Sequence, residues 1–558
     1  MNDIRRTILW VIFGFSMVLL WDQWQVYNGN KATFFPQPTA KTAPAAGTAA
    51  TGAVGVAAPA PSASAAGSAS VPGAPGAVAA PAMARQRYEA RTDVMALTFD
   101  SDGGSLVRTV LLKYQDDHGP TPTAPFVLLD DSKDRVYLAQ TGLVGAPGLP
   151  THKTPMRLVS SQRELKDGED ALVLRFESAE TGGVTLAKTW TFPRGRYEAT
   201  VVHEIVNVGS ATVAPQLYVQ LVRDGNKPPG ESSFYSTFTG PAVYSPEKKY
   251  QKVEFSDIEK GKADFEKNAP SGYVAMVQHY FASAWVLPDG PRENFMRKLE
   301  TNLYAVGAIA APLPALAPGQ TAKAEARFYA GPQEEKRLEA MAPGLELVKD
   351  YGWFTVFSKP LFWLLDYLYK LLGNWGWAIV ALVVLLKVAF YWLNAKAYAS
   401  MAKMKAINPK VMEMRERLKD DPQKMQQEMM RIYREEKVNP MGGCFPILVQ
   451  IPVFIALYWV LLSSVEMRGA PWIGWIKDLS APDPWFILPA LMTASSLLQT
   501  WLNPTPPDPM QAKMMWIMPL VFGIMFFFFP AGLVLYWLTN NILSIAQQWI
   551  INKRLGVA

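Results

Sequence analysis

The sequence predicts two structural classes in one chain: a membrane α-helical part with six transmembrane helices, five of them forming one core, and an all-β domain outside the cytoplasm. Three observations lead to this prediction. An apolar N-terminal run follows two arginines, the middle of the chain alternates with period two, and the C-terminal third contains long apolar runs. The chain is 49% hydrophobic and has one cysteine, which excludes a disordered chain and a disulfide scaffold. Its net charge of +6 over 558 residues is too small to indicate nucleic-acid binding.

Residues 1–27 are predicted to form a signal-anchor helix. Arg5 and Arg6 precede the apolar run Ile8–Leu20, and two tryptophans follow it. A cleaved signal peptide is the alternative, but no pair of small residues follows the run at cleavage-site spacing. The arginines are expected to hold the start of the helix in the cytoplasm, so that the chain emerges on the outer side of the membrane.

Residues 28–84 are predicted to be a disordered linker, and residues 85–345 an extracytoplasmic β-sandwich. Residues 42–82 contain only Ala, Pro, Gly, Ser, Thr and Val, which cannot bury enough surface to offset chain entropy. In the domain, alternating runs such as Val201–Val206 and Gln216–Leu221 are separated by Gly, Pro, Asp and Asn, which is typical of antiparallel sheets. All four histidines lie here singly, without metal-ligand spacing, so we expect structural roles for them rather than catalytic ones.

The helical part is predicted to begin with an amphipathic helix over residues 346–373. Lys359, Asp366 and Lys370 are spaced i, i+7 and i+11, and they form a narrow polar stripe on an otherwise aromatic and aliphatic helix. Such a helix is expected to lie on the outer membrane interface.

Five membrane spans are predicted to follow. The region 395–440 contains eleven Lys or Arg against seven Asp or Glu, and the C-terminal tail carries Lys553 and Arg554. The positive-inside rule assigns both regions, and both termini, to the cytoplasmic side. Residues 374–394 form the first of these spans, and residues 441–558 contain the others, over 445–465, 485–502, 514–529 and 531–551.

The cytoplasmic segment 395–440 is predicted to be a helical hairpin. Asn408-Pro409 is expected to start its first helix and Asp421-Pro422 its second, because proline is favoured at the first helical position. Two interpretations stay open: a hairpin that satisfies its own apolar seam, or a docking platform for a ribosome, nascent chain or targeting factor, since Met-rich faces repack around varied partners. The candidate docking residues are Met414, Arg415, Arg417, Met425, Met429 and Arg431.

The predicted spans of the five-helix core lack Asp, Glu and His, and they contain a single cation, Lys387. Intramembrane polar groups face the interior of a bundle or a wet cavity, so Lys387 is expected in a hydrated groove open to the cytoplasm; the alternative is a lysine that snorkels to the interface. No Walker A loop, metal cluster or catalytic pair is visible, so we expect no enzyme activity, cofactor or metal. The groove is predicted to contain Lys387, Gln450, Ser495, Gln499, Asn540, Ser544 and Gln547.

Several motifs give the chain a family resemblance. Asn439-Pro-Met-Gly-Gly-Cys-Phe-Pro446 followed by Gln450-Ile-Pro452 resembles the signature entering the third span of the YidC/Oxa/Alb membrane protein insertase family. The runs Ser400–Met404, Asp508–Gln511 and Pro530–Tyr536 also resemble that family. The resemblance implies a Gram-negative inner-membrane protein with a periplasmic supersandwich similar to sugar mutarotases, a structural role for Cys444, and a groove cation that is usually Arg where this chain has Lys387.

The expected function is therefore that of a membrane protein insertase and chaperone. The polar tail of a client protein is expected to enter the groove, and its apolar helix to leave along an apolar surface. The implied partners are nascent integral membrane proteins, the Sec translocon with its accessory subunits, transiently a ribosome or targeting factor, and the lipid bilayer, with no direct nucleic-acid contact. A small-solute transporter and an envelope glycan enzyme are the rival classes. The surface that the client helix would follow, called the slide below, is predicted to comprise Ile451, Pro452, Phe454, Tyr458, Met518, Phe522 and Met525.

Overall fold

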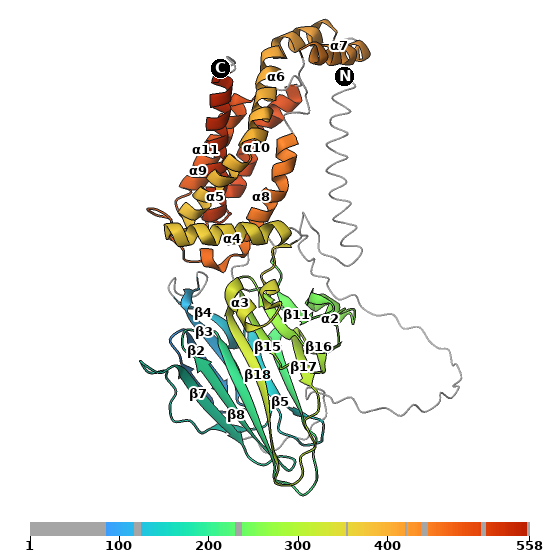
Figure 1. The fold of residues 1–558 in the computed structure, drawn as a ribbon, viewed down its shortest axis with the longest axis vertical. Coiled ribbons are helices and arrows are strands. Elements are labelled where there is room, and N and C mark those ends of the chain that lie inside the picture. Colours follow the sequence, from blue (N-terminus) through green and yellow to red (C-terminus); the bar gives the residue numbers. More distant parts are fainter. Residues whose placement is uncertain are drawn as a thin grey trace, which may run out of the picture.

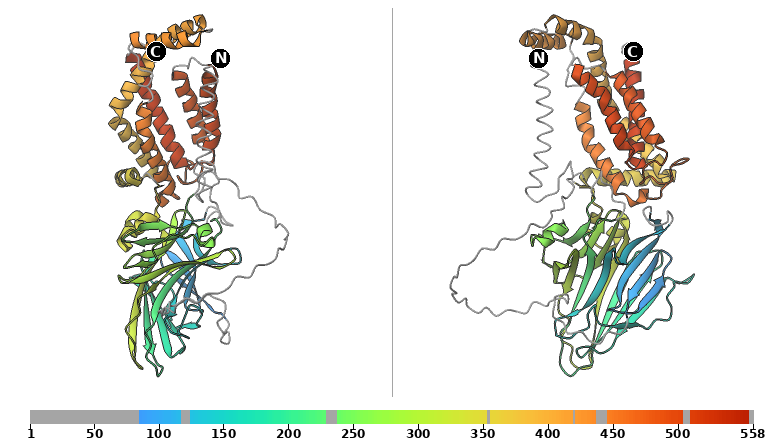
Figure 2. Two further views of the ribbon diagram at one scale, coloured as in Figure 1. Left: turned by 90° about the vertical axis from the view of Figure 1, so that its right-hand side faces the viewer. Right: turned by 180° about the vertical axis from the view of Figure 1, so that it is seen from behind.

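The computed structural model of the chain describes residues 85–116, 124–228, 237–352, 355–418, 421–436, 445–503 and 509–554. It consists of a β-sandwich at one end and a helical bundle at the other, with helix α4 (Thr355–Leu372) lying across the boundary between them (Figures 1 and 2). The predicted anchor helix, the linker and Cys444 lie outside the described residues.

Within the described residues, two antiparallel sheets of nine strands each form the sandwich, which confirms the predicted all-β domain. The predicted alternation is clearest in the strand that contains Val201–Val206, where buried and half-buried side chains alternate throughout. The first sheet has the order β1 (Arg87–Arg91), β2 (Met95–Asp100), β3 (Ser105–Gln115), β4 (Pro125–Asp131), β5 (Val136–Val144), β10 (Gln216–Asp224), β17 (Leu303–Ala310), β16 (Arg292–Glu300) and β13 (Asn268–Ala269). The second has the order β12 (Lys249–Lys252), β11 (Gly240–Ser245), β14 (Tyr273–Gln278), β15 (Phe281–Val286), β18 (Thr321–Pro332), β9 (Glu198–Asn207), β8 (Val184–Pro193), β7 (Ala171–Ser178) and β6 (Met156–Leu158).

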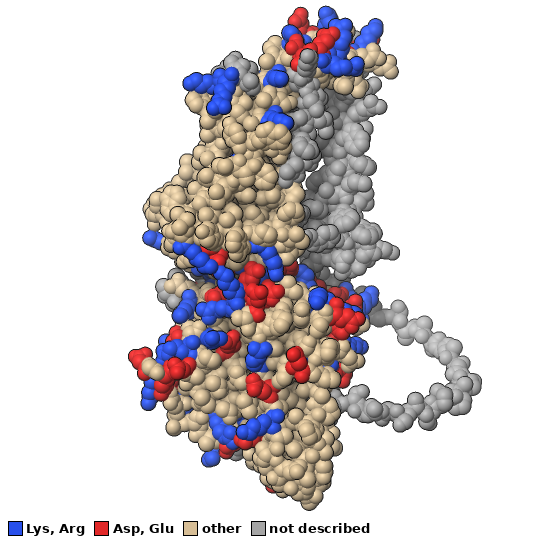
Figure 3. Space-filling view, viewed as in Figure 1, with Lys and Arg blue, Asp and Glu red and all other residues tan. Residues whose placement is uncertain are grey.

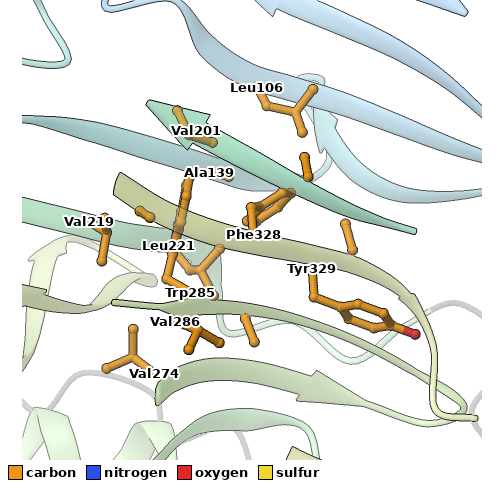
Figure 4. Packing of buried hydrophobic residues seen from close by; sticks show 14 of the residues in the cluster. Leu106, Ala139, Val201, Val219, Leu221, Val274, Trp285, Val286, Phe328 and Tyr329 are labelled. Carbon is orange, nitrogen blue, oxygen red and sulfur yellow. The ribbon is translucent and has the colours of Figure 1, made fainter. Parts of the chain in front are cut away.

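The core of the sandwich lies between these sheets and is rich in aromatic side chains (Figure 4). Trp285 of β15 packs on Phe328 of β18 with ring centroids 4.7 Å apart, and its indole N–H donates to the carbonyl oxygen of Gln220 on the opposite sheet, 3.2 Å away. Burying an aromatic or aliphatic side chain of this size contributes about 1.5–3 kcal/mol. The indole hydrogen bond joins the sheets in addition to this apolar contact.

A polar cluster is buried within this apolar core. The Lys188 ammonium donates to the carbonyl oxygens of Gly103 and Thr141 at 2.6 and 2.7 Å, and the ring of His203 bonds the Thr141 hydroxyl at 2.8 Å. Burial lowers the pKa of Lys188 to about 7 and the pKa of His203 to about 3. His152 bonds the Tyr218 hydroxyl at 2.5 Å, so these two described histidines are neutral groups held by hydrogen bonds inside the sandwich.

The chain leaves the sandwich through two short helices, α3 (Glu335–Met341) and the 3₁₀ helix η1 (Leu345–Val348), before α4 begins. The interfacial helix predicted over residues 346–373 therefore corresponds to α4, which begins at Thr355 and not at residue 346. The exposed side of α4 carries Trp363 and Tyr367, and the predicted Asp366–Lys370 pair forms at 2.9 Å. The sequence correctly identified the polar stripe of this helix.

The sandwich is fixed to the bundle by a group of contacts around the segment that follows helix α8 (Phe445–Ser463). The ammonium of Lys349 is fully buried, lies 3.1 Å from the carboxylate of Glu466, and sits 3.8 Å from the ring centroid of Phe362 on α4. The ring of His279, at the β14–β15 turn, donates to the carbonyl oxygen of Leu462 at 3.0 Å. The two parts of the chain are thus joined by an ion pair and hydrogen bonds at the outer end of α8.

In the part of the chain that the structure describes, the helical bundle consists of seven α-helices. Besides α8, these are α5 (Trp375–Ala389), α6 (Tyr391–Arg417), α7 (Pro422–Glu435), α9 (Ile487–Leu502), α10 (Pro509–Phe526) and α11 (Ala531–Arg554); α2 (Phe255–Glu259) lies in the sandwich, and η3 (Val465–Met467) follows α8. α11 packs against α5, α6 and α9, whereas α10 packs chiefly against α9. α11 is therefore the central helix of the bundle.

One predicted boundary is wrong. Pro409 does not start a helix but lies inside α6, which continues unbroken from Tyr391 to Arg417. Proline removes one helical hydrogen bond, but Pro409 is exposed, so water can reach the carbonyl oxygen that loses its donor. The second predicted start is found where expected, because Asp421 caps α7 by accepting from the backbone N–H of Lys424 at 3.1 Å.

The described helices do not confirm the count of six spans. No single one of them combines the length and the apolar composition of a membrane-crossing helix. By these criteria α5 and α6 could cross only as a pair, and they are bent by 70° where they meet; shorter apolar helices cover Gln450–Ser463, Ile487–Leu502 and Ala512–Phe526. The number of spans stays a prediction.

Candidate functional site

The position of helix α5 is fixed at its start by a cap. The Asn374 side chain accepts from the backbone N–H of Trp377 at 3.1 Å, and its amide donates to the carbonyl oxygens of Pro471 and Trp472. Gly376 lets the indole of Trp472 pack directly on the helix, since an added Cβ would lie 2.2 Å from that ring. These contacts set the rotation of α5 and hence the direction of Lys387 in its last turn.

A cavity of about 160 Å³ lies between α5, α8 and α11. Three of its lining residues are polar, and each comes from a different helix: Lys387 from α5, Gln450 from α8 and Asn540 from α11. The rest of the wall is formed by Val383, Leu386, Phe390, Ile451, Val453, Phe454 and Tyr536. The cavity is thus an apolar space with a few convergent polar groups, a common form of ligand site.

The ammonium of Lys387 is directed at α11. It donates to the Ser544 hydroxyl at 2.6 Å, and that hydroxyl donates to the carbonyl oxygen of Asn540 at 2.7 Å. Within the described residues, no carboxylate forms an ion pair with Lys387, in keeping with the absence of acidic residues from the predicted spans. The cavity therefore carries a positive charge that other side chains hydrogen-bond without neutralising.

Other predicted groove residues lie away from this cavity. Ser495 of α9 accepts from the Asn541 amide at 3.2 Å on a different side of α11, and Gln499 is half-buried on the same helix as Ser495. Gln547 donates to the carbonyl oxygen of Tyr391, next to the bend between α5 and α6. The polar residues predicted as one site are therefore dispersed: Ser495 lies at the contact between α9 and α11, and Gln547 lies near the bend between α5 and α6.

Tyr536 lines the cavity but is not among the groove residues predicted from the sequence. A signal for it was present, because Tyr536, Asn540 and Ser544 are spaced i, i+4 and i+8 and so share a face of α11.

The two halves of the predicted slide have different surroundings. On α8, Ile451 and Phe454 line the cavity, and Phe454 stacks on Trp537 with centroids 5.4 Å apart. On α10, Met518 and Phe522 are exposed on the surface of the bundle. The remaining predicted slide residues, Pro452, Tyr458 and Met525, are half-buried.

Charged side chains gather at the two ends of the helical bundle. The visible face between these ends is almost free of them, whereas blue and red side chains mark α7 and the sandwich with its junction (Figure 3). The exposed residues of α10 and α9 include Trp516, Ile517, Leu520, Ile524, Leu491 and Trp501. An apolar surface of this extent between two charged regions is suited to a lipid environment.

The hairpin of α6 and α7 covers part of its own predicted docking surface. Met414 is buried, and Met425 and Met429 are half-buried. Arg431 pairs with Glu428 at 2.6 Å on α7, and Lys410 pairs with Glu436 across the hairpin at 2.6 Å. Of the predicted docking residues, Arg417 stays exposed and Arg415 is half-buried.

Comparison with known proteins identifies both parts of the chain. A family model described as the YidC periplasmic domain matches residues 87–364, and one described as 60Kd inner membrane protein matches residues 367–557. The membrane protein insertase YidC of Bordetella petrii is 55% identical, and that of Bordetella avium 56%, each over 99% of this chain and 98% of the relative. A solved active YidC insertase covers 82% of this chain and 91% of its own, at 18% identity and a TM-score of 0.38.

Proposed function

The chain belongs to the YidC family of inner-membrane insertases, and we propose that its cavity beside Lys387 receives the polar segment of a client while the client's apolar helix passes along the slide. The protein inserts membrane proteins into the inner membrane and does so without enzymatic chemistry. Its substrates are membrane proteins, and it works in contact with lipid. The transporter and glycan-enzyme alternatives are thereby set aside.

The observation that carries the proposal is a half-buried ammonium without a carboxylate partner among the described residues. A lysine within an apolar bundle costs about 2.5–3.5 kcal/mol on insertion scales, so it is kept only where something compensates for that cost. Ser544 compensates in part, and a polar or acidic client segment in the cavity would compensate further. No covalent step is needed, because burial of the client's apolar residues supplies about 25 cal/mol per Å².

The same proposal includes a topology. α7 and the C-terminal end of α11 lie at the end of the bundle away from the sandwich (Figure 1). Since the sandwich matches a periplasmic domain, this supports a cytoplasmic position for the hairpin and the C-terminus. We propose six spans with both termini inside, residues 1–27 being the first.

We further propose that the cytoplasmic hairpin meets a ribosome or targeting factor and that the protein also acts beside the Sec translocon. The exposed Arg417 and the exposed methionines Met412 and Met430 support a contact surface of mixed charge and apolar character. Such a surface suits transient partners of varied shape. The large apolar face of α10 leaves room for a client or translocon helix.

The test of the groove is a substitution series at Lys387 in proteoliposomes. Lys387→Arg should insert an acidic-tailed client nearly as well as the parent chain, because it keeps the charge and adds donors. Lys387→Ala should insert less, and Lys387→Glu least, because the carboxylate repels acidic tails. Lys403→Ala is the control, since Lys403 is an exposed lysine of α6. The readout is protease protection of the client tail, and equal insertion by all variants would refute the groove.

A further inference from the structure

Ser544 lies at the meeting point of three helices. Its hydroxyl accepts from the Lys387 ammonium of α5 at 2.6 Å and donates to the Asn540 carbonyl oxygen of α11 at 2.7 Å. Tyr398 of α6 lies close to it. The Ser544 side chain is buried, whereas Lys387 is half-buried.

The hydrogen-bonding capacity of this hydroxyl matches its surroundings. A serine hydroxyl has one donor and two acceptor lone pairs, and here its donor faces a carbonyl while one acceptor lone pair faces an ammonium. The Lys387 ammonium has three donors and uses one of them on Ser544. Its other N–H groups are left to interact with whatever occupies the adjoining cavity.

We propose that Ser544 is the positioning residue of the groove: it holds the Lys387 ammonium against α11 at the wall of the cavity, and so sets the preference for acidic over neutral client segments. This proposal rests on the proposed function of the groove. Lysine is a long, flexible side chain, and without an anchor its ammonium would sample positions along α5 toward the bend at Phe390. The anchor keeps the charge where Gln450 and Asn540 also converge.

The role differs from that of an ordinary polar residue in the bundle. Ser495 also carries a hydroxyl in a helix–helix contact, but its partner is Asn541 and no cation is involved. Removing either hydroxyl deletes a partly buried hydrogen bond between two helices, and only the Ser544 hydroxyl contacts the ammonium of Lys387. Ser495→Ala is therefore the matched control for Ser544→Ala.

The experiment uses the full chain in vesicles of phosphatidylethanolamine and phosphatidylglycerol. A single-span client is offered with an acidic tail or with the same tail after Asp→Asn and Glu→Gln replacement, and the protected fraction of each is measured. Ser544→Ala should lower insertion of the acidic tail about tenfold, the effect of losing a hydrogen bond to a charged group, and leave the neutral tail unchanged. Ser544→Thr should restore the preference because it keeps the hydroxyl, and Ser495→Ala should leave it intact.

A second measurement reports on the lysine itself. Labelling of Lys387 by a water-soluble amine reagent, followed by peptide mass spectrometry, should rise in Ser544→Ala and stay at the parent level in Ser544→Thr. The proposal is overturned if Ser544→Ala keeps both the tail preference and the labelling, or if it lowers both tails equally without rescue by threonine. If Lys387→Ala itself leaves the tail preference unchanged, the groove function has failed as well; if only Ser544→Ala is silent, the positioning role alone is wrong.

Discussion

Removing the Glu466 carboxylate should loosen the junction between sandwich and bundle more than removing the Lys349 ammonium does. The Lys349 side chain has no exposed surface, whereas that of Glu466 is 19% exposed. In Glu466→Gln, the ammonium stays buried with only a neutral acceptor. In Lys349→Met, the aliphatic stem stays against Phe362 and the carboxylate that remains can reach water.

The magnitudes follow from this asymmetry. Leaving one partner of a buried ion pair unpaired costs about 3–5 kcal/mol, so Glu466→Gln should cost about 3 kcal/mol after allowing for its neutral acceptor. Lys349→Met should lower the stability of the junction by about 1 kcal/mol, the typical value of a partly exposed ion pair. The lost cation–π contact is replaced by a contact between the thioether and the ring. The double variant should approach Lys349→Met, because no buried charge is left in it.

The assay is hydrogen exchange of the intact chain in detergent, read on peptides that cover η1 and η3. A local opening made 3 kcal/mol easier should exchange about a hundredfold faster, and one made 1 kcal/mol easier only about fivefold faster. Peptides of β8 and β9 serve as the internal control, since they lie in the sandwich core. Equal acceleration in the two single variants, or a larger effect of Lys349→Met, would refute the assignment of Lys349 as the more deeply buried charge.

Three further predictions concern other parts of the chain. Lys188→Met should flatten the pH dependence of sandwich stability. The pKa of Lys188 is about 7 in the folded chain and 10.5 when exposed, so between these values the unfolded chain binds the extra proton and the stability of the parent should rise with pH. Thermal unfolding across this pH range measures the effect, with Lys133→Met as the exposed control. Gly376→Ala should push the Trp472 indole off α5 and speed hydrogen exchange in the loop that carries it. Ala378→Ser, at another buried position of the same helix, should leave that loop unchanged. Deleting residues 409–437 should lower client insertion while the protein still accumulates in the membrane, since α11 packs on α5 and α9 without them; loss of the protein from the membrane would assign the hairpin a structural role.

The sequence predicted the type of several secondary-structure elements better than the residues at which they begin. Alternation in β9 and the stripe on α4 are direct consequences of side-chain periodicity, so they could be recognised without coordinates. The position of Pro409 could not, because whether a proline starts a helix or is tolerated inside one depends on which of its carbonyl neighbours reach water. That exposure is a tertiary property.

The candidate site shows the same division. The absence of acidic residues from the predicted spans identified Lys387 as the significant charge, and the helical spacing of Asn540 and Ser544 placed both on one face. The periodicity of a single helix does not reveal which face of α9 packs against α11, because tertiary packing decides it. One such packing contact is the approach of α10 to α9 at Thr493, which Gly523 allows. Ser495 was therefore assigned to the groove although it bonds Asn541.

Helix α8 connects the cavity beside Lys387 with the junction between the sandwich and the bundle. Its inner half contributes Gln450 and Phe454 to the wall of the cavity, and its last residues, with the segment that follows, carry the contacts to His279 and Lys349 of the sandwich. A buried ion pair tolerates little displacement before its charges lose their partners. A movement of the sandwich relative to the bundle must therefore either break this junction or move the outer end of α8, and a moving α8 changes the cavity in which Lys387 lies.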